Sequence, residues 1–168
     1  MTLPWWVGVV GLAGVGVVLW TRTKPAPVAP TPSGDDAFAG NATAYNGSGW
    51  VWKQSSGELY YGSAKVAVGY SGLGDGLNNP NKQNVPNVGP IPTGGYVIGP
   101  AFDSPSSGPL TLPLQPTDPA FAEGRTGFEI HGDSLEHPGQ ASHGCIVVAR
   151  AAREQIVESG DPNLQVIV

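Results

Sequence analysis

One short segment of the chain concentrates the residues that could do chemistry. Residues 128–150 (FEIHGDSLEHPGQASHGCIVVAR) contain all three histidines and the only cysteine. A thiol acts as a nucleophile only as the thiolate, and with a free pKa near about 8.5 it is largely neutral at pH 7 unless a base takes its proton. The segment therefore indicates either a cysteine nucleophile with a histidine base or a metal site.

His131 and Cys145 are the candidate base and nucleophile. His131 ends the apolar run 127–131, and Cys145 precedes the apolar run 146–148; both runs predict β-strands. If these strands are neighbours, the two side chains can face each other across the intervening loop. The sequence therefore predicts a catalytic Cys–His pair.

The residues just before Cys145 are candidates for an oxyanion or substrate-binding role. Gly144 permits a tight backbone turn, so the amides of Gly144 and Cys145 could point at a developing oxyanion. Ser142 and His143 could add donors or line the pocket. For His143 the alternative is a plain loop residue.

A zinc site is the alternative interpretation of these clustered residues. Its ligands would be suitable side chains, namely His131, Asp133, His137, His143 and Cys145. Their spacing matches no common zinc pattern, and they crowd into one loop and its edges. We therefore expect no metal and no other cofactor.

Composition predicts a mostly β fold. The chain has 25 Gly and 17 Pro, and 12% of its residues are charged, which disfavours a helical bundle and favours short strands joined by turns. The net charge is −5 and no basic patch is present, so nucleic acid is not an expected partner. With one cysteine, no internal disulfide can form.

Hydrophobic patterning predicts a series of short strands and one soluble helix. A hairpin is expected over 50–61, where Trp50 and Trp52 share one face and favour core packing over sugar stacking. The helix is expected over 149–159, with Ala152, Ile156 and Val157 on its apolar face. Residues 71–95 predict a long irregular loop. Further strands are expected at 65–69, 96–98, 110–112, 127–131 and 164–168.

The first forty residues do not resemble a globular domain. Residues 4–20 are uncharged and almost wholly apolar, with Trp5, Trp6 and Trp20 at the two ends, as in a membrane span. A cleaved signal peptide would need a basic start and a small-x-small end, which this segment lacks. The predicted organisation is a single transmembrane helix at 1–24, a Pro-rich linker at 25–41 and a folded domain at 42–168. Two basic residues after the span favour a cytoplasmic domain, so its orientation stays open.

The motifs around the cysteine resemble the L,D-transpeptidase (YkuD-type) catalytic domain. The carrying pieces are His131-Gly132 and Ser142-His143-Gly144-Cys145-Ile146. More closely, they are similar to the divergent branch of type VI secretion L,D-transpeptidase effectors, which attack peptidoglycan. The likeness covers roughly residues 50–168. Its matching pieces are IHGDS (130–134), PG (138–139), AS-x-GCIV (141–147), GYSG (69–72), G-x-NNP (76–80), N-x-GPIP-x-G-x-Y (87–96) and GP-x-x-L (108–112).

This resemblance implies a fold and a reaction. The fold would be a mostly β (α+β) sandwich or barrel with one main helix. Cys145 would attack the carbonyl between meso-diaminopimelate and D-Ala in a tetrapeptide stem, with His131 as base and then acid. Water or an amine would resolve the thioacyl enzyme. The domain would act in the periplasm of its own or a target cell, as a single-pass membrane protein, with an immunity protein as a further partner if it is an effector.

Two departures from the family pattern bear on function. Typical members carry Arg two residues after the Cys, where this chain has Val147; Arg150 either replaces it in binding a carboxylate or is a surface charge. The short His–Cys interval favours hydrolysis over cross-linking. Two other functions remain open: a non-catalytic wall-binding module and a metal-dependent peptidase.

Several nearby residues have two interpretations. Asp133 and Ser134 are expected to brace the loop through local hydrogen bonds rather than do chemistry. Tyr70, Ser71 and the pair Asn78 and Asn79 either touch substrate or form turns. His137 is expected in an exposed loop.

Overall fold

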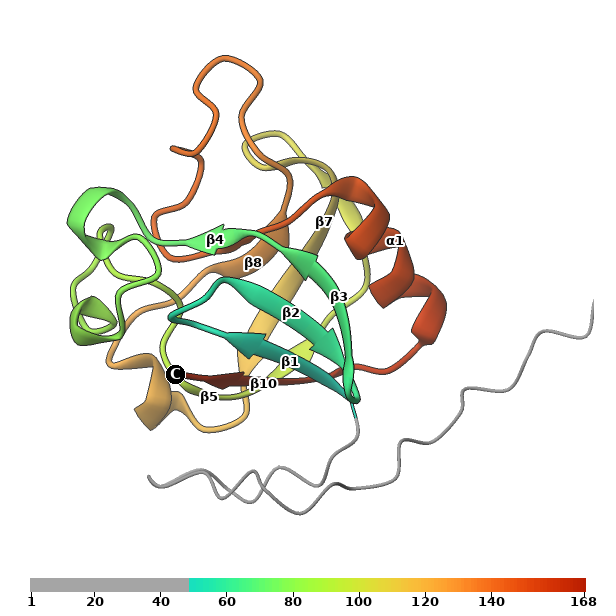
Figure 1. Ribbon diagram of the computed structural model, residues 1–168, viewed down its shortest axis with the longest axis horizontal. Coiled ribbons are helices and arrows are strands. Elements are labelled where there is room, and N and C mark those ends of the chain that lie inside the picture. Colours follow the sequence, from blue (N-terminus) through green and yellow to red (C-terminus); the bar gives the residue numbers. More distant parts are fainter. Residues whose placement is uncertain (1–48) are drawn as a thin grey trace, which may run out of the picture.

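A computed structural model describes residues 49–168, which form one sheet-based domain (Figure 1). It contains ten strands, one α-helix and three 3-10 helices within these residues. The strands are β1 (Trp50–Lys53), β2 (Glu58–Tyr61), β3 (Ala64–Val68), β4 (Tyr70–Ser71), β5 (Gly94–Ile98), β6 (Phe102–Ser104), β7 (Gly108–Pro116), β8 (Phe128–His131), β9 (Ile146–Val147) and β10 (Asn163–Ile167). The helices are η1 (Gly74–Gly76), η2 (Pro80–Lys82), η3 (Pro119–Ala122) and α1 (Arg150–Ser159).

The sheet is nearly closed into a barrel. Its strand order is β3-β2-β1-β10-β5-β7-β8-β9-β4, with β6 paired to β7 alone. The two outermost strands, β3 and β4, are separated in sequence by the single residue Gly69, so the chain passes directly from one edge to the other. A Cβ at Gly69 would collide with the Val147 carbonyl oxygen, so this close approach requires glycine.

The core confirms the predicted packing of the first hairpin. Trp50 and Trp52 are both buried, and they join Leu59, Tyr96 and Leu164 in one hydrophobic cluster. β1 is flanked by β2 on one side and, in parallel, by β10 on the other. Burial of the two indoles against strands from distant parts of the chain therefore anchors the start of the domain to its end.

The predicted helix is present, but its buried face differs from the predicted one. α1 packs against β7 and β8, and its buried residues are Ala152, Arg153 and Ile156, whereas Val157 is exposed. The helix ends at Gly160 in the left-handed conformation, as the Gly-Asp-Pro sequence predicts. Arg153, rather than Val157, therefore lies on the buried side of the helix, and it forms part of the candidate site.

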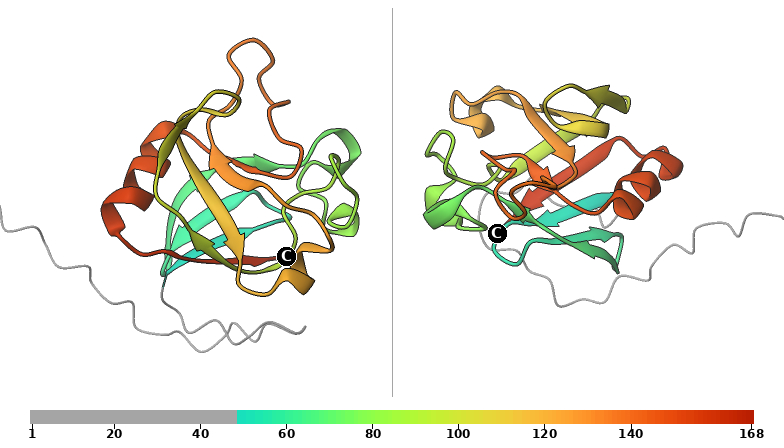
Figure 2. Two further views of the ribbon diagram at one scale, coloured as in Figure 1. Left: turned by 180° about the vertical axis from the view of Figure 1, so that it is seen from behind. Right: turned by 90° about the horizontal axis from the view of Figure 1, so that it is seen from above.

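The loop between β8 and β9 extends away from the barrel. It projects beyond the strands in both side views (Figures 1 and 2), and Leu135 near its tip is 98% exposed. The expected irregular stretch 71–95 contains η1 and η2 and otherwise turns, and β5 begins at Gly94. β4 and β6 are short strands that the sequence did not predict.

Two parts of the predicted architecture are corrected. The mostly β character with one α-helix holds for residues 49–168, as a barrel-like sheet. The preceding transmembrane helix and the single-pass membrane location are not supported: across 49–168 we find no helix whose length and apolar character suit a membrane crossing. The predicted span at 1–24 and linker at 25–41 lie outside the described residues, so the domain boundaries stay a prediction.

Candidate active site

Strand pairing brings the chain segments that carry His131 and Cys145 next to each other. β8 and β9 are parallel, with Ile130 opposite Ile146 and His131 opposite Val147. Both isoleucines are fully buried in the core. Because side chains alternate along a strand, His131 points to the outer face, whereas Cys145 lies directly before β9, outside the regular strand. Ideal strand geometry continued to Cys145 would put the two Cα atoms roughly 8 Å apart, from a strand spacing of about 4.8 Å and a rise of about 3.3 Å per residue.

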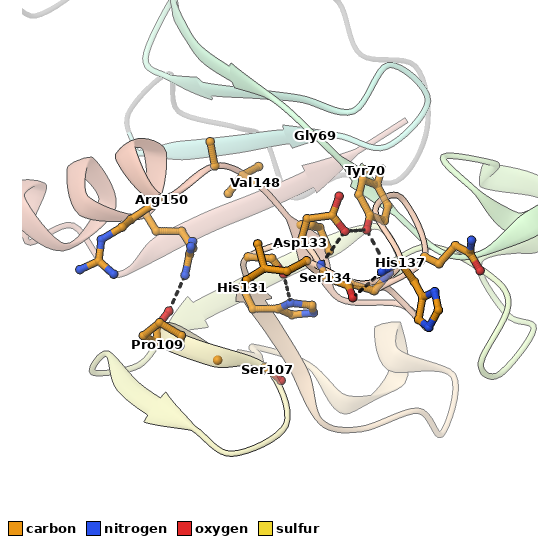
Figure 3. A pocket seen from close by; sticks show the side chains of 18 of the residues that line it. Gly69, Tyr70, Ser107, Pro109, His131, Asp133, Ser134, His137, Val148 and Arg150 are labelled. Carbon is orange, nitrogen blue, oxygen red and sulfur yellow. Dashed lines mark hydrogen bonds between the residues drawn. The ribbon is translucent and has the colours of Figure 1, made fainter.

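The His131 ring is oriented by its own loop. Its Nδ1 lies 2.7 Å from the Gly132 carbonyl oxygen, which can only accept, so Nδ1 carries the proton and donates it (Figure 3). The tautomer set by this bond leaves the lone pair on Nε2. His131 is 5% exposed, so the ring has little freedom to turn. This arrangement suits a general base.

The Cys145 thiol is half-buried and protonated at neutral pH. Burial raises its pKa to about 11, the Glu129 carboxylate adds to the rise, and the Glu129 amide and the Arg125 guanidinium oppose it. The Sγ lies 3.7 Å from the Gly127 carbonyl oxygen, to which the thiol donates. The thiol thus rests against the start of β8 and needs a base to become a nucleophile.

Ser142 organises the backbone around the cysteine. It is fully buried, and its Oγ donates to the Cys145 carbonyl oxygen at 2.6 Å. The Ser142 Oγ also accepts from the Gly72 amide at 2.8 Å and from the Gly144 amide at 3.1 Å. The Gly144 amide is therefore already engaged, and of the two amides named from the sequence only that of Cys145 remains a candidate oxyanion donor.

A second serine supports the same turn from the neighbouring strand. Ser71, on β4, donates from Oγ to the Gly144 carbonyl oxygen at 3.2 Å and accepts from the Ile91 amide at 2.8 Å. β4 also pairs with β9, placing Ser71 opposite Ile146. Ser71 thus holds the turn rather than facing a ligand, which decides between its two predicted roles.

Arg125 joins three segments around Cys145. Its guanidinium donates to the carbonyl oxygens of Gln83, Gly89 and Pro90 and to that of His143. It also lies over the Phe128 ring, 5.2 Å from the centroid. A Cβ at Gly144 would collide with this guanidinium, which explains the glycine at that position, where φ is +133°.

An open pocket of about 830 Å³ lies on the outer face beside His131 (Figure 3). His143 and Val147 line it near the pair, and Arg150 and Arg153 line it from α1. Cys145 is not among the lining residues. Its Sγ instead contacts the Gly127 carbonyl oxygen.

The loop that borders the pocket is braced by Asp133, as predicted. Its carboxylate accepts from the amides of Ser134 and Gly139 and from the Tyr70 hydroxyl, which in turn accepts from the Ala141 amide. Burial alone would raise the pKa of Asp133, but these hydrogen bonds outweigh it and hold the pKa below its usual value. Burial raises the pKa of Tyr70 to about 12, so its hydroxyl stays protonated and keeps donating.

The five candidate metal ligands do not form a metal site. Among residues 49–168 there is no group of three or more His, Cys, Asp or Glu side chains arranged to hold an ion. His137 and His143 are exposed, and Asp133 is occupied by the loop. The described residues therefore offer no ligand geometry for the metal-dependent alternative.

Two arginines of this region were missed from the sequence. Arg125 lies in a turn between η3 and β8, and nothing in its spacing distinguishes it from a surface charge. Arg153 left a signal, because it lies three positions before Ile156 and so on the inward side of the helix. Arg150, which the sequence singled out, is exposed and pairs with Glu154 at 2.8 Å.

Comparisons with known proteins identify a family for this chain. The Tlde1 domain matches residues 65–166. Among solved structures, one titled "Structure of Bdellovibrio bacteriovorus Bd1075" is similar with a TM-score of 0.46 and 16% identity, over 70% of this chain and 46% of that chain. The chain thus spans less than half of that protein. A comparison with curated proteins gives no match.

The family match covers more than half of the chain and places this mostly β barrel in the L,D-transpeptidase-like class. The chain belongs to the Tlde1 domain family, the family of type VI secretion L,D-transpeptidase effectors. The roles of individual residues go beyond the family assignment and are proposed below.

Proposed function

We propose that the chain is a cysteine acyltransferase or peptidase that cleaves the meso-diaminopimelate–D-Ala bond of peptidoglycan tetrapeptide stems. The observation that carries this proposal is the parallel pairing of β8 with β9, which brings the segment of Cys145 beside that of His131, together with the Nδ1 bond to Gly132 that leaves Nε2 free as a base. Family membership supports the substrate class.

The reaction begins with the thiol. His131 Nε2 takes the Cys145 proton as Sγ attacks the carbonyl carbon of the L-centre of diaminopimelate. The amide of Cys145 stabilises the resulting oxyanion. The imidazolium then gives its proton to the departing amine of D-Ala, and a thioester remains on Cys145.

The thioester is resolved by one of two nucleophiles. Water gives a tripeptide stem, which is L,D-carboxypeptidase activity, and a D-amino acid or a second stem gives exchange or a cross-link. His131 again takes the proton of the incoming group and returns it to the Cys145 sulfur, which leaves as the thiol. The short loop between His131 and Cys145 favours water, since it encloses less of the acceptor side.

The protein would act on the wall from the periplasmic side of a target cell, as an effector. An immunity protein is then the expected partner in the producing cell. Such an inhibitor would act by covering the pocket beside His131.

The test is to incubate the full chain with purified disaccharide tetrapeptides and identify the products by mass. Loss of one alanine indicates hydrolysis, and replacement of that alanine by an added D-amino acid indicates exchange. Cys145→Ala and His131→Ala should each reduce turnover by about 10³-fold or more, while a chelator should have no effect. Intact tetrapeptide after incubation with folded wild-type protein would refute the proposal, and binding without turnover would point to the wall-binding module instead.

A further inference from the structure

Arg153 is a buried cation in the wall of the pocket. It extends from α1 and is 5% exposed. Burial lowers its pKa, and the nearby Arg150 lowers it further. A guanidinium nevertheless stays charged in proteins, so the helix holds a positive charge in a site where charges are costly unless they are paired.

No carboxylate in the described part of the chain pairs with this charge. The ion pairs of residues 49–168 are Lys65 with Glu58 and Arg150 with Glu154. Arg153 bonds through Nη1 to the carbonyl oxygens of Pro109 and Leu110, at 2.7 and 2.8 Å. Its Nε is buried without a hydrogen-bond partner. The edge formed by Nε and Nη2 is the edge with which arginine grips a carboxylate through two parallel bonds.

That edge lies next to the candidate catalytic histidine. A Cβ at Gly132 would come within 2.9 Å of Arg153 Nη2, so Gly132 leaves the space that the guanidinium occupies. Gly132 is also the residue whose carbonyl oxygen accepts from His131. Arg153, Gly132 and His131 all line the same pocket. The unpaired charge is therefore available to a ligand that lies against His131.

We infer that Arg153 binds a carboxylate of the stem peptide that is being cleaved, and so fixes the peptide beside His131 and Cys145. This inference rests on the proposed function. Tetrapeptide stems offer two such groups near the scissile bond: the free carboxylate of the diaminopimelate side chain and the terminal carboxylate of D-Ala. Arg150, the candidate named from the sequence, is less suited, because its charge is exposed and already matched by Glu154.

The experiment compares three ligands on the full-length Cys145→Ala protein. They are the disaccharide tetrapeptide, the same peptide with the diaminopimelate side-chain carboxyl converted to an amide, and the same peptide ending in D-alanine amide. Dissociation constants are measured by calorimetry with and without Arg153→Gln. We expect one of the two amides to bind about 10- to 100-fold more weakly than the acid, because a charged hydrogen-bonded pair is lost. The affected amide identifies the carboxylate.

The decisive result is how Arg153→Gln and amidation of the peptide combine. Arg153→Gln should weaken binding of the acid by a similar factor and leave binding of the affected amide nearly unchanged, because both changes remove the same interaction. Lys82→Gln, an exposed charge on η2, serves as the control for charge loss alone. If the sensitivity to amidation persists in Arg153→Gln and disappears in Arg150→Gln, the proposal is wrong and Arg150 is the binding residue.

Three further outcomes are informative. Because Arg153 also donates to two backbone carbonyl oxygens, Arg153→Gln could unfold the domain. In that case the affinities of the acid and of the two amidated peptides, measured on the protein with Arg153 intact, test the inference alone. Equal affinity for the acid and both amides overturns the inference, while cleavage of the acid by wild-type protein would leave the proposed function intact. Failure of wild-type protein to bind or cleave any tetrapeptide would instead refute the proposed function.

Discussion

At the scale of the residue, the resting Cys145 is a neutral thiol rather than a preformed ion pair. Burial and the Glu129 carboxylate favour the protonated form, and the thiol donates to the Gly127 carbonyl oxygen. A nucleophile then forms only when His131 takes the proton as the substrate carbonyl approaches. This limits unwanted alkylation and oxidation, which require the thiolate.

The first prediction concerns alkylation of this thiol. The thiolate fraction of a group with a pKa of about 11 rises tenfold with each pH unit below that value. The second-order rate of iodoacetamide reaction with the free protein should therefore climb from pH 7 to pH 10 without levelling, whereas an ordinary thiol levels above about pH 8.5. Mass spectrometry of the alkylated protein gives the rate, and a plateau below pH 8 would contradict the prediction.

A second prediction at this scale concerns Ser142. Ser142→Ala removes one donor and one acceptor, and with them the hydrogen bonds to the amides of Gly72 and Gly144 and to the Cys145 carbonyl oxygen. We expect a loss of about 1–3 kcal/mol in the free energy of unfolding and a lower kcat, because the turn bearing the nucleophile loosens. Urea unfolding and turnover assays measure both. The exposed Ser55→Ala should change neither, and an equal effect of the two substitutions would contradict a special role of Ser142.

At the scale of the element, the loop between β8 and β9 depends on one tyrosine at its base. Tyr70 donates to Asp133 and accepts from the Ala141 amide, so it joins both ends of the loop to β4. The loop carries residues of the pocket, including Asp133, Leu135 and His143. Its position therefore controls how the pocket is bounded.

We predict that Tyr70→Phe frees this loop. Without the hydroxyl, the Ala141 amide loses its hydrogen-bond acceptor and the Asp133 carboxylate loses one donor. The backbone amides of residues 133–141 should then exchange with deuterium several-fold faster. KM should rise more than kcat falls, since Cys145 and His131 themselves are unchanged. Tyr60→Phe removes a hydroxyl bonded to Glu58, away from the loop, and is the matched control. Unchanged exchange over 133–141 would show that the loop is held by other contacts.

The sequence was informative where local pattern sets structure. Alternation correctly placed Trp50 and Trp52 in the core, and Asp133 was correctly expected to brace its loop, whereas the catalytic roles of His131 and Cys145 stay a prediction. Contacts made by closing the barrel could not be read from spacing. The guanidinium of Arg125 meets carbonyl groups from two distant segments, and Arg153 is buried because α1 packs on β7 and β8.

At the scale of the whole molecule, β10 holds the barrel together. It lies between β1 and β5, parallel to the first and antiparallel to the second. Val166 is 1% exposed and belongs to the core, whereas the adjacent Gln165 points to the other side of the sheet. The last strand of the domain thus completes a sheet whose other members come from much earlier in the chain.

We predict that Val166→Asp prevents folding. An unpaired carboxylate in the core costs several kcal/mol, a large share of the about 5–15 kcal/mol that stabilises a typical domain. Near-ultraviolet circular dichroism of the tryptophans should be lost. Gln165→Glu adds the same charge on the other side of the strand and should leave the spectrum intact. A cooperative thermal transition in Val166→Asp would contradict this account.

The parallel pairing of β1 with β10 also sets when activity can appear during synthesis. Trp50 pairs with Leu164, so the first strand to leave the ribosome must wait for the last before the sheet can close. Pairings this distant in sequence slow folding. A growing chain therefore cannot close the sheet that carries the pocket before β10 has been synthesised.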